Sequence, residues 1–224
     1  MAKVYFVPGL GTDVRIFSNL IPLLNIEDGD WECLEYQDPE HLNESIATYA
    51  QRLVASIGPL EEPPVLIGMS MGGTIVTEMA KAMPHRQLVV ISSYKHKSEV
   101  PFLFKIARLF PVYRLVPAWL IRRVVPFFAR LLLICDRKDS LVLRDMLFAR
   151  TDLHFAWGRR AIVKWDNDWY PERFVHINGN RDHIFLSANK QITHLIKGGT
   201  HNIVLDRAEE VAKIINEAAF EDEM

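Results

Sequence analysis

The sequence predicts an α/β protein, in which a mostly parallel sheet of about six strands is flanked by helices and interrupted by one helical insertion. Three observations predict this class. Short apolar runs alternate with amphipathic helical patterns over most of the 224 residues. A Gly-Met-Ser-Met-Gly turn joins one such run to the helical pattern after it. From Tyr94 to about Pro171 no strand pattern occurs, and about 75 residues is far longer than an ordinary loop.

The expected strands are short runs rich in β-branched and aromatic residues, most of them bounded by turn signals. They cover residues 3–8, 31–36, 65–69, 87–92, 174–177 and 192–196. The expected helices have apolar residues at helical spacing, over residues 14–24, 46–57 and 71–83. A last helix is expected to start at Asp206, where Glu209 three residues later forms a capping-box-like pair.

The long strand-free segment divides the chain into two predicted domains. Residues 1–94 and 172–224 would form the core, and residues 95–171 a helical cap, or lid, over one end of the sheet. Between Lys95 and Asp139 the segment holds ten basic and three acidic residues, with phenylalanines, Tyr113 and Trp119 interleaved. The cap is therefore predicted to be both basic and rich in aromatic residues.

Composition favours one ordinary globular chain, with 49% hydrophobic residues, 24% charged residues and a formal net charge of −2. This balance argues against a nucleic-acid-binding protein. No apolar run reaches the roughly 20 residues that a membrane span needs, and the N-terminal run is too short for a signal peptide, so we expect a cytoplasmic protein. Cys33 and Cys135 are too few for a disulfide framework or a multi-cysteine zinc site. No metal or organic cofactor is expected.

The turn from Gly68 to Gly72 has the pattern Gly-x-Ser-x-Gly between a strand and a helix, which is typical of a nucleophile elbow. A serine on so tight a turn projects its hydroxyl from the sheet edge, and the helix N-terminus favours the negative charge that develops during attack. Ser70 is therefore the candidate nucleophile. The alternative is a glycine-rich turn with a capping serine, since the five-residue pattern is common by chance.

Two backbone N–H groups are expected to form an oxyanion hole. One belongs to Met71, directly after the nucleophile, and the other to Leu10, in the loop that follows the first strand. The same loop contains Gly9-Leu10-Gly11, which begins a dinucleotide-binding pattern. That pattern fails at its third glycine, where Val14 stands.

The base and the orienting acid should follow late strands. His201 stands in a loop directly after a late strand, in Gly-Gly-Thr-His-Asn. Asp182 follows the strand before it, and Ser70, Asp182, His201 is the chain order of a nucleophile-elbow triad. Asp166 and Asp168 are rival acids, but they precede a strand. A turn-forming aspartate is the alternative interpretation of Asp182.

With these residues, the sequence resembles a serine hydrolase of the α/β-hydrolase superfamily, esterase- or lipase-like, over roughly residues 3 to 220. The resemblance implies cleavage of a carboxylic ester or related acyl substrate through an acyl-enzyme intermediate, and it places the insertion where that family has its cap. Thioesterases, acyltransferases and C–C bond hydrolases share the pattern, and a non-catalytic ligand-binding protein on the scaffold is a further alternative. Pro8-Gly9 stands where many members have His-Gly.

The expected ligand is a small hydrophobic acyl substrate held under the cap. The basic, aromatic cap also suggests contact with an anionic lipid surface. The favoured interpretation is that its arginines are simply solvated, with their stems covering apolar surface. No nucleic-acid partner is predicted, and the sequence indicates no oligomeric state.

Overall fold

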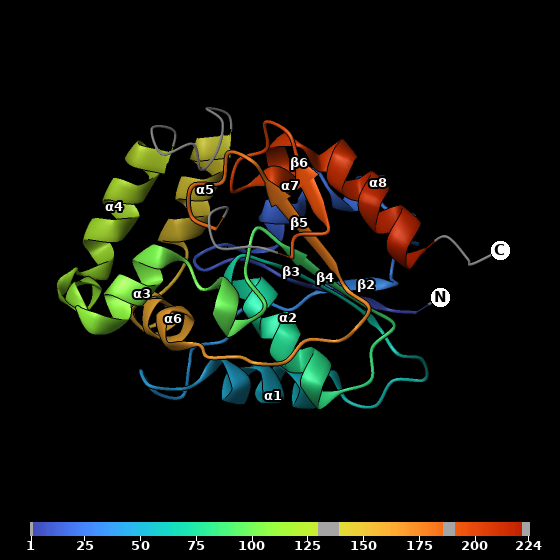
Figure 1. The fold of residues 1–224 in the computed structure, drawn as a ribbon, viewed down its shortest axis with the longest axis horizontal. Helices are drawn as coiled ribbons and strands as arrows, with labels where there is room; N and C mark the ends of the chain where they lie inside the picture. The colour runs from blue at the N-terminus through green and yellow to red at the C-terminus, as the bar shows by residue number, and fades with distance from the viewer. Residues whose placement is uncertain (1, 130–138, 186–190, 221–224) are drawn as a thin grey trace.

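The computed structural model describes residues 2–129, 139–185 and 191–220, with the backbone alone described at 118, 125–129, 139 and 140 (Figure 1). Its centre is a six-stranded sheet in which every neighbouring pair is parallel, in the order β2-β1-β3-β4-β5-β6. The strands are β1 (Val4–Val7), β2 (Trp31–Cys33), β3 (Val65–Met69), β4 (Gln87–Ile91), β5 (Val175–Gly179) and β6 (His194–Ile196). The predicted fold class is confirmed.

Helices cover both faces of this sheet (Figure 1). On one face lie α1 (Ile46–Ile57) and α2 (Met71–Ala82), and on the other α7 (Ile203–Asp206) and α8 (Ala208–Ala219). Successive strand side chains enter opposite core layers, so that Phe6 packs in one layer and Tyr5 in the other. Because both faces are covered, the central strands read as continuous apolar runs.

The predicted helix at residues 46–57 is confirmed as α1, and local chemistry explains its ends. The Ser45 side chain accepts a hydrogen bond from the N–H of Thr48, which caps the helix. Gly58 ends it with a φ of 75°, a conformation that glycine adopts readily.

Two helix predictions are wrong. Residues 14–24 form two short 3-10 helices, η1 (Val14–Phe17) and η2 (Ile21–Leu23), because Pro22 has no N–H with which to continue a helical ladder. The last helix begins at Ala208 rather than at Asp206, which ends α7. The Asp206 carboxylate accepts a hydrogen bond from the N–H of Thr200, so the capping-box interpretation fails.

The outer strands are shorter than the sequence suggests. The second strand ends at Cys33 instead of residue 36, and β6 begins at His194 instead of residue 192. Both strands lie at the edges of the sheet and pair with a single neighbour. The apolar pattern in the sequence extends beyond the few residues that find a partner strand, so it overestimates the length of each strand. The strand expected at 174–177 is shifted by one residue at its start and ends at Gly179.

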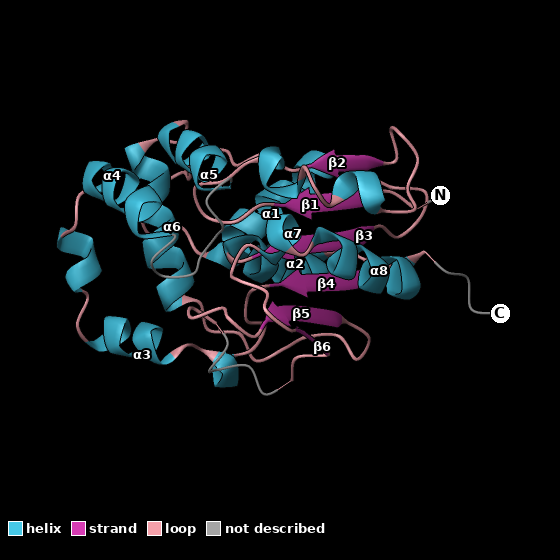
Figure 2. Cartoon of the chain, turned by 90° about the horizontal axis from the view of Figure 1, so that it is seen from above, coloured by secondary structure: helices cyan, strands magenta, loops and turns pink. Residues whose placement is uncertain are grey.

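The described part of the segment between β4 and β5 contains helices and no strand: η3 (Lys97–Glu99), α3 (Phe102–Leu109), η4 (Val112–Leu115), α4 (Ala118–Ala129), α5 (Asp139–Phe148) and α6 (Asp152–Lys164). Figure 2 shows α3 to α6 at the end of the sheet to which the strands point. Inside this segment α6 is largely buried, whereas α3 and η4 have no buried residue.

Cys135 and four charged residues of the predicted basic cap, at 130, 136, 137 and 138, lie outside the described residues. Among the helices that are described, none has the length and apolar character needed to cross a bilayer.

Candidate active site

Ser70 lies at the tight turn between β3 and α2, with φ 54° and ψ −120°. The two glycines of the motif allow the backbone segments around it to touch. A Cβ atom on Gly68 would lie 2.3 Å from the carbonyl oxygen of Gly72, and one on Gly72 would lie 2.1 Å from the carbonyl oxygen of Val7. Glycine is therefore a steric requirement at both positions, as the nucleophile-elbow interpretation expects.

Hydrogen bonds fix the backbone of Ser70 in this strained conformation. Its N–H donates to the carbonyl of Ile91 at 2.9 Å. Its carbonyl accepts from the N–H of Gly73 at 2.9 Å and from the Ser93 hydroxyl at 2.6 Å. The serine is thus held by its own helix and by the end of the neighbouring strand β4.

The structure brings Ser70, His201 and Asp182 together. His201 Nε2 lies 3.2 Å from Ser70 Oγ, and His201 Nδ1 lies 2.9 Å from Asp182 Oδ2. A carboxylate only accepts hydrogen bonds, so the proton of the neutral imidazole sits on Nδ1 and Nε2 is free to accept the serine proton. The rival acids Asp166 and Asp168 are exposed, and Asp168 pairs with Lys97.

The surroundings of Asp182 keep it ionised. The N–H groups of Ile184 and Phe185 donate to its other oxygen at 2.8 and 3.1 Å. Burial alone raises the pKa of Asp182, but the charge and hydrogen bond of His201, with the two backbone donors, together bring that pKa below its usual value. The Phe185 ring stacks on the imidazole of His201, with centroids 5.4 Å apart.

A second close approach of glycines joins the loop that contains Asp182 to the loop that contains His201. A Cβ atom on Gly179 would lie 2.2 Å from the carbonyl oxygen of Gly199. The N–H of Arg181 donates to that same carbonyl at 2.9 Å. The loops that follow β5 and β6 can therefore lie directly against each other, which sets the distance between Asp182 and His201.

The loop after β1 passes directly beside the serine, since a Cβ on Gly9 would lie 3.3 Å from that of Ser70. The Leu10 side chain packs against α6 at Gly158. Neither Leu10 nor Met71 donates a backbone hydrogen bond to another described residue. Two free N–H groups beside the serine are what an oxyanion hole needs.

Residues remote in sequence anchor this loop, and sequence reasoning missed them. The Tyr36 hydroxyl donates to the carbonyl of Pro8 at 2.9 Å, and Arg150 donates to that of Thr12 at 2.8 Å. His154 Nε2 accepts from the N–H of Gly11 at 3.3 Å. Burial, with the charge of Arg150, lowers the pKa of His154 to about 4, so its ring stays a neutral acceptor. No spacing motif links His154 to the loop, which lies 143 residues away.

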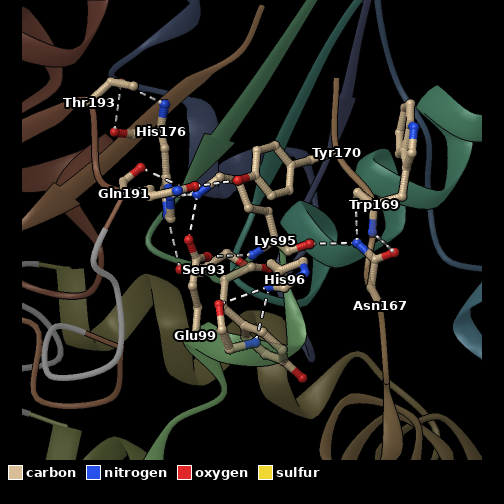
Figure 3. Close-up of polar contacts among 12 residues, drawn as sticks. Ser93, Lys95, His96, Glu99, Asn167, Trp169, Tyr170, His176, Gln191 and Thr193 are labelled. Carbon is tan, nitrogen blue, oxygen red and sulfur yellow. Dashed lines mark hydrogen bonds and ion pairs between the residues drawn. The ribbon is translucent and has the colours of Figure 1, made fainter. Parts of the chain in front are cut away.

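Lys95 is a buried cation within a cluster of polar and aromatic side chains (Figure 3). Lys95 Nζ lies 2.6 Å from Glu99 Oε1 and 3.3 Å from His176 Nδ1, over the rings of Tyr170 and Phe174. Burial lowers the pKa of Lys95, although Glu99 opposes that shift. Burial and the Lys95 charge also lower the pKa of His176 to about 4.

Hydrogen bonds connect this cluster to the serine. His176 Nε2 is 3.1 Å from the carbonyl of Ser93, and a carbonyl only accepts, so the ring proton is on Nε2. The Ser93 hydroxyl in turn donates to the carbonyl of Ser70. The path runs from the Lys95–Glu99 pair through two residues to the backbone of the candidate nucleophile.

A cavity of about 410 Å³ opens onto the serine. Its lining is almost entirely apolar, with Leu10, Ser70, Leu103, Phe104, Ala107, Tyr113, Arg159, Ile162, Val163, Ile184 and Phe185. The Arg159 guanidinium already donates to the carbonyls of Phe155, Tyr113 and Val116. Over the described ranges, His, Cys, Asp and Glu form no group of three that could hold a metal ion.

Comparison with known proteins agrees with the fold described above. The model of a family described as the alpha/beta hydrolase family matches residues 4–214. No curated protein matches this chain significantly in sequence.

Several solved structures share the fold. A hydrolase from Pseudomonas aeruginosa has a TM-score of 0.73 at 15% identity, over 98% of this chain and 91% of its own. A thermophilic esterase from Thermogutta terrifontis, with malate bound, has a TM-score of 0.69 at 17% identity, over 97% and 89%. A lipase-esterase related protein from Clostridium acetobutylicum has a TM-score of 0.66 at 20% identity, over 97% and 94%.

Proposed function

Since the chain belongs to the alpha/beta hydrolase family and is a hydrolase, we propose that it cleaves carboxylic esters through an acyl-enzyme intermediate on Ser70. One observation carries the proposal. Ser70 Oγ, the His201 ring and the Asp182 carboxylate form a continuous line of hydrogen bonds at 3.2 and 2.9 Å. That line opens into the cavity at the end of the sheet.

The reaction follows from the role that each group can play. As Ser70 Oγ attacks the ester carbonyl carbon, His201 Nε2 takes the serine proton. Asp182 stabilises the imidazolium that forms. The N–H groups of Leu10 and Met71 donate to the oxyanion. His201 then protonates the leaving alcohol, and the acyl group stays on Ser70. Water, deprotonated by the same imidazole, releases the acid and regenerates the serine.

The cavity favours a hydrophobic acyl group. Its walls combine residues of the core loops with residues of α3, η4 and α6, among them Phe104, Tyr113 and Ile162. In this proposal residues 95–171 act as the cap of the hydrolase, because their helices supply most of the apolar wall beside Ser70. A cavity of this size suits a small acyl ester.

Replacement of the nucleophile tests the proposal. Ser70→Ala should lower hydrolysis of a short p-nitrophenyl ester by roughly 10⁴-fold or more, on the scale seen when a triad serine is lost. Ser18→Ala, at an exposed serine that does not line the cavity, is the control and should retain full activity. Wild-type turnover in the folded Ser70→Ala variant would refute the assignment.

A fluorophosphonate probe separates catalysis from ligand binding. The probe should label wild-type protein and the Ser18→Ala control, but not Ser70→Ala. Folded wild-type protein that stays unlabelled would favour a non-catalytic binding protein on this scaffold. Labelling without ester turnover would leave thioesters, other acyl acceptors and C–C bonds as the substrates to assay.

A further inference from the structure

The helices α3, η4 and α4 form an outer face whose large apolar side chains are exposed. Both ribbon views place these elements at the end of the molecule away from the two termini (Figures 1 and 2). Seventeen described large hydrophobic residues are exposed, and ten of them fall within residues 102–124. Leu109 is 75% exposed and Leu115 is 80% exposed. So dense a patch on a soluble chain indicates a surface that meets something apolar.

Helical geometry shows that this exposure belongs to one side of α3. Its inner side contributes Phe104 and Ala107 to the packing around the core. The other side presents Phe102, Ile106 and Leu109, which are three and four residues apart and share one face. Phe110 directly follows and is also exposed. The helix α3 therefore has two apolar sides. Among the described residues, only the inner side packs against the core.

The charged residues of α3, η4 and α4 are all basic. From residue 102 to residue 129 the sequence has five basic residues and no acidic residue. Arg108 and Arg122 donate to backbone carbonyls. By contrast, Lys105, Arg114 and Arg123 are exposed and form no ion pair with a described residue. Exposed aromatic and aliphatic residues beside exposed cations are typical of interfacial helices.

We propose that this outer face docks on the surface of an anionic lipid bilayer. Charge complementarity selects this occupant, because basic residues near a membrane are attracted to its anionic headgroups. A second copy of the chain fits less well, since a two-fold interface would bring Lys105, Arg114 and Arg123 against the same patch of the partner. The sequence alone favoured a cap that packs on the core and keeps its arginines in solvent, rather than contact with a membrane. The exposure of Leu109, Phe110 and their neighbours removes the packing on which that interpretation relied.

Docking would place the substrate cavity at the lipid surface. Leu103 is exposed on α3 and also lines the cavity, together with Tyr113 of η4. Apolar contact therefore continues from the outer face toward Ser70. An acyl ester dissolved in the membrane is then the substrate class, a step that rests on the proposed esterase function.

Vesicle flotation tests the docking itself, without reference to catalysis. Wild-type protein should float with vesicles of phosphatidylcholine mixed with phosphatidylglycerol, much less with phosphatidylcholine alone, and less as salt rises. The variants Leu109→Ser/Phe110→Ser and Lys105→Glu/Arg123→Glu should each lose about tenfold or more of the vesicle affinity. None of these four residues lines the cavity.

Matched variants and a soluble substrate keep the two proposals apart. Leu195→Ser and Lys213→Glu change an exposed leucine and an exposed lysine on β6 and α8, and should float like wild type. All variants should hydrolyse a soluble short ester at the wild-type rate. Vesicle binding without ester turnover would refute the esterase and preserve the docking face. No binding, equal binding to both vesicle types, or a dimer that buries Leu109 and Phe110 would overturn the docking proposal.

Discussion

The carboxyl-terminal edge of the sheet, around Ser70, and the outer face of α3, η4 and α4 are built in opposite ways. At the edge, backbone meets backbone, and Gly72 and Gly179 have no room for a single carbon atom. On the outer face, α3 and η4 bury no residue. The difference indicates that contacts within the chain hold the edge. In the docking proposal, by contrast, the outer face is covered by the lipid surface. Substitutions around Ser70 should therefore strongly reduce activity or stability, whereas substitutions on the outer face should change stability little.

The largest expected effect is on turnover. Asp182→Asn removes the charge that stabilises the imidazolium of His201, and should lower kcat/KM for a short ester by roughly 10⁴-fold, as for other triad aspartates. Asp145→Asn, at an exposed aspartate of α5, should change the rate by less than about twofold. A comparable loss in Asp168→Asn, with Asp182→Asn active, would show that the acid is misassigned.

Close backbone contact predicts the next largest effect. Gly72→Ala places a Cβ 2.1 Å from the carbonyl oxygen of Val7, so β1 or the elbow must shift. We expect a loss of more than about 4 kcal/mol in the free energy of unfolding by urea, a range seen only for severe defects. Gly58→Ala is the control, because its φ of 75° disfavours a side chain but nothing lies within 4 Å of the added Cβ. That change should cost only about 1 kcal/mol. Similar costs for both variants would contradict the tight packing of the edge.

A buried and an exposed lysine compare the two regions directly. Lys95→Met leaves the buried Glu99 without its cation and should cost about 3 kcal/mol of the free energy of unfolding at neutral pH. Lys105→Met, on the outer side of α3, should change stability by less than about 0.5 kcal/mol. Equal losses would mean that α3 is packed more tightly than its exposure indicates.

Sequence reasoning succeeded where a local pattern forces a geometry. The strand, turn and helix around Gly68-Met69-Ser70-Met71-Gly72 could be predicted because the glycine spacing and the flanking periodicity agree. The order of Ser70, Asp182 and His201 along the chain was enough to select residues that the fold brings within hydrogen-bond distance. Their catalytic role stays a prediction until the variants are measured.

Contacts between distant segments could not be predicted. Asp206 and Glu209 have the spacing of a local helix cap. In the folded chain, however, the Asp206 carboxylate accepts a hydrogen bond from the N–H of Thr200 in the preceding loop. Likewise, nothing in the neighbourhood of His154 or Tyr36 indicates that both hold the loop containing Leu10. Such partners are set by tertiary packing, which a single sequence does not encode as a spacing.

The smallest expected effect concerns acid, and it tests whether the loop beside Ser70 depends on a neutral His154. The pKa of His154 falls from 6.5 to about 4 on folding, so the fold favours the neutral ring. Its contribution to stability is therefore complete above pH 6.5 and is lost as the pH falls toward 4, with about 2 kcal/mol lost by pH 5. His154→Gln keeps an acceptor for the N–H of Gly11 but does not titrate. Urea unfolding from pH 7 to pH 5 should then show a loss smaller by about 2 kcal/mol, whereas His41→Gln, at an exposed ring, should show the wild-type loss. An unchanged acid loss in His154→Gln would mean that this histidine does not couple the loop to pH, and that the edge around Ser70 is held by its backbone contacts alone.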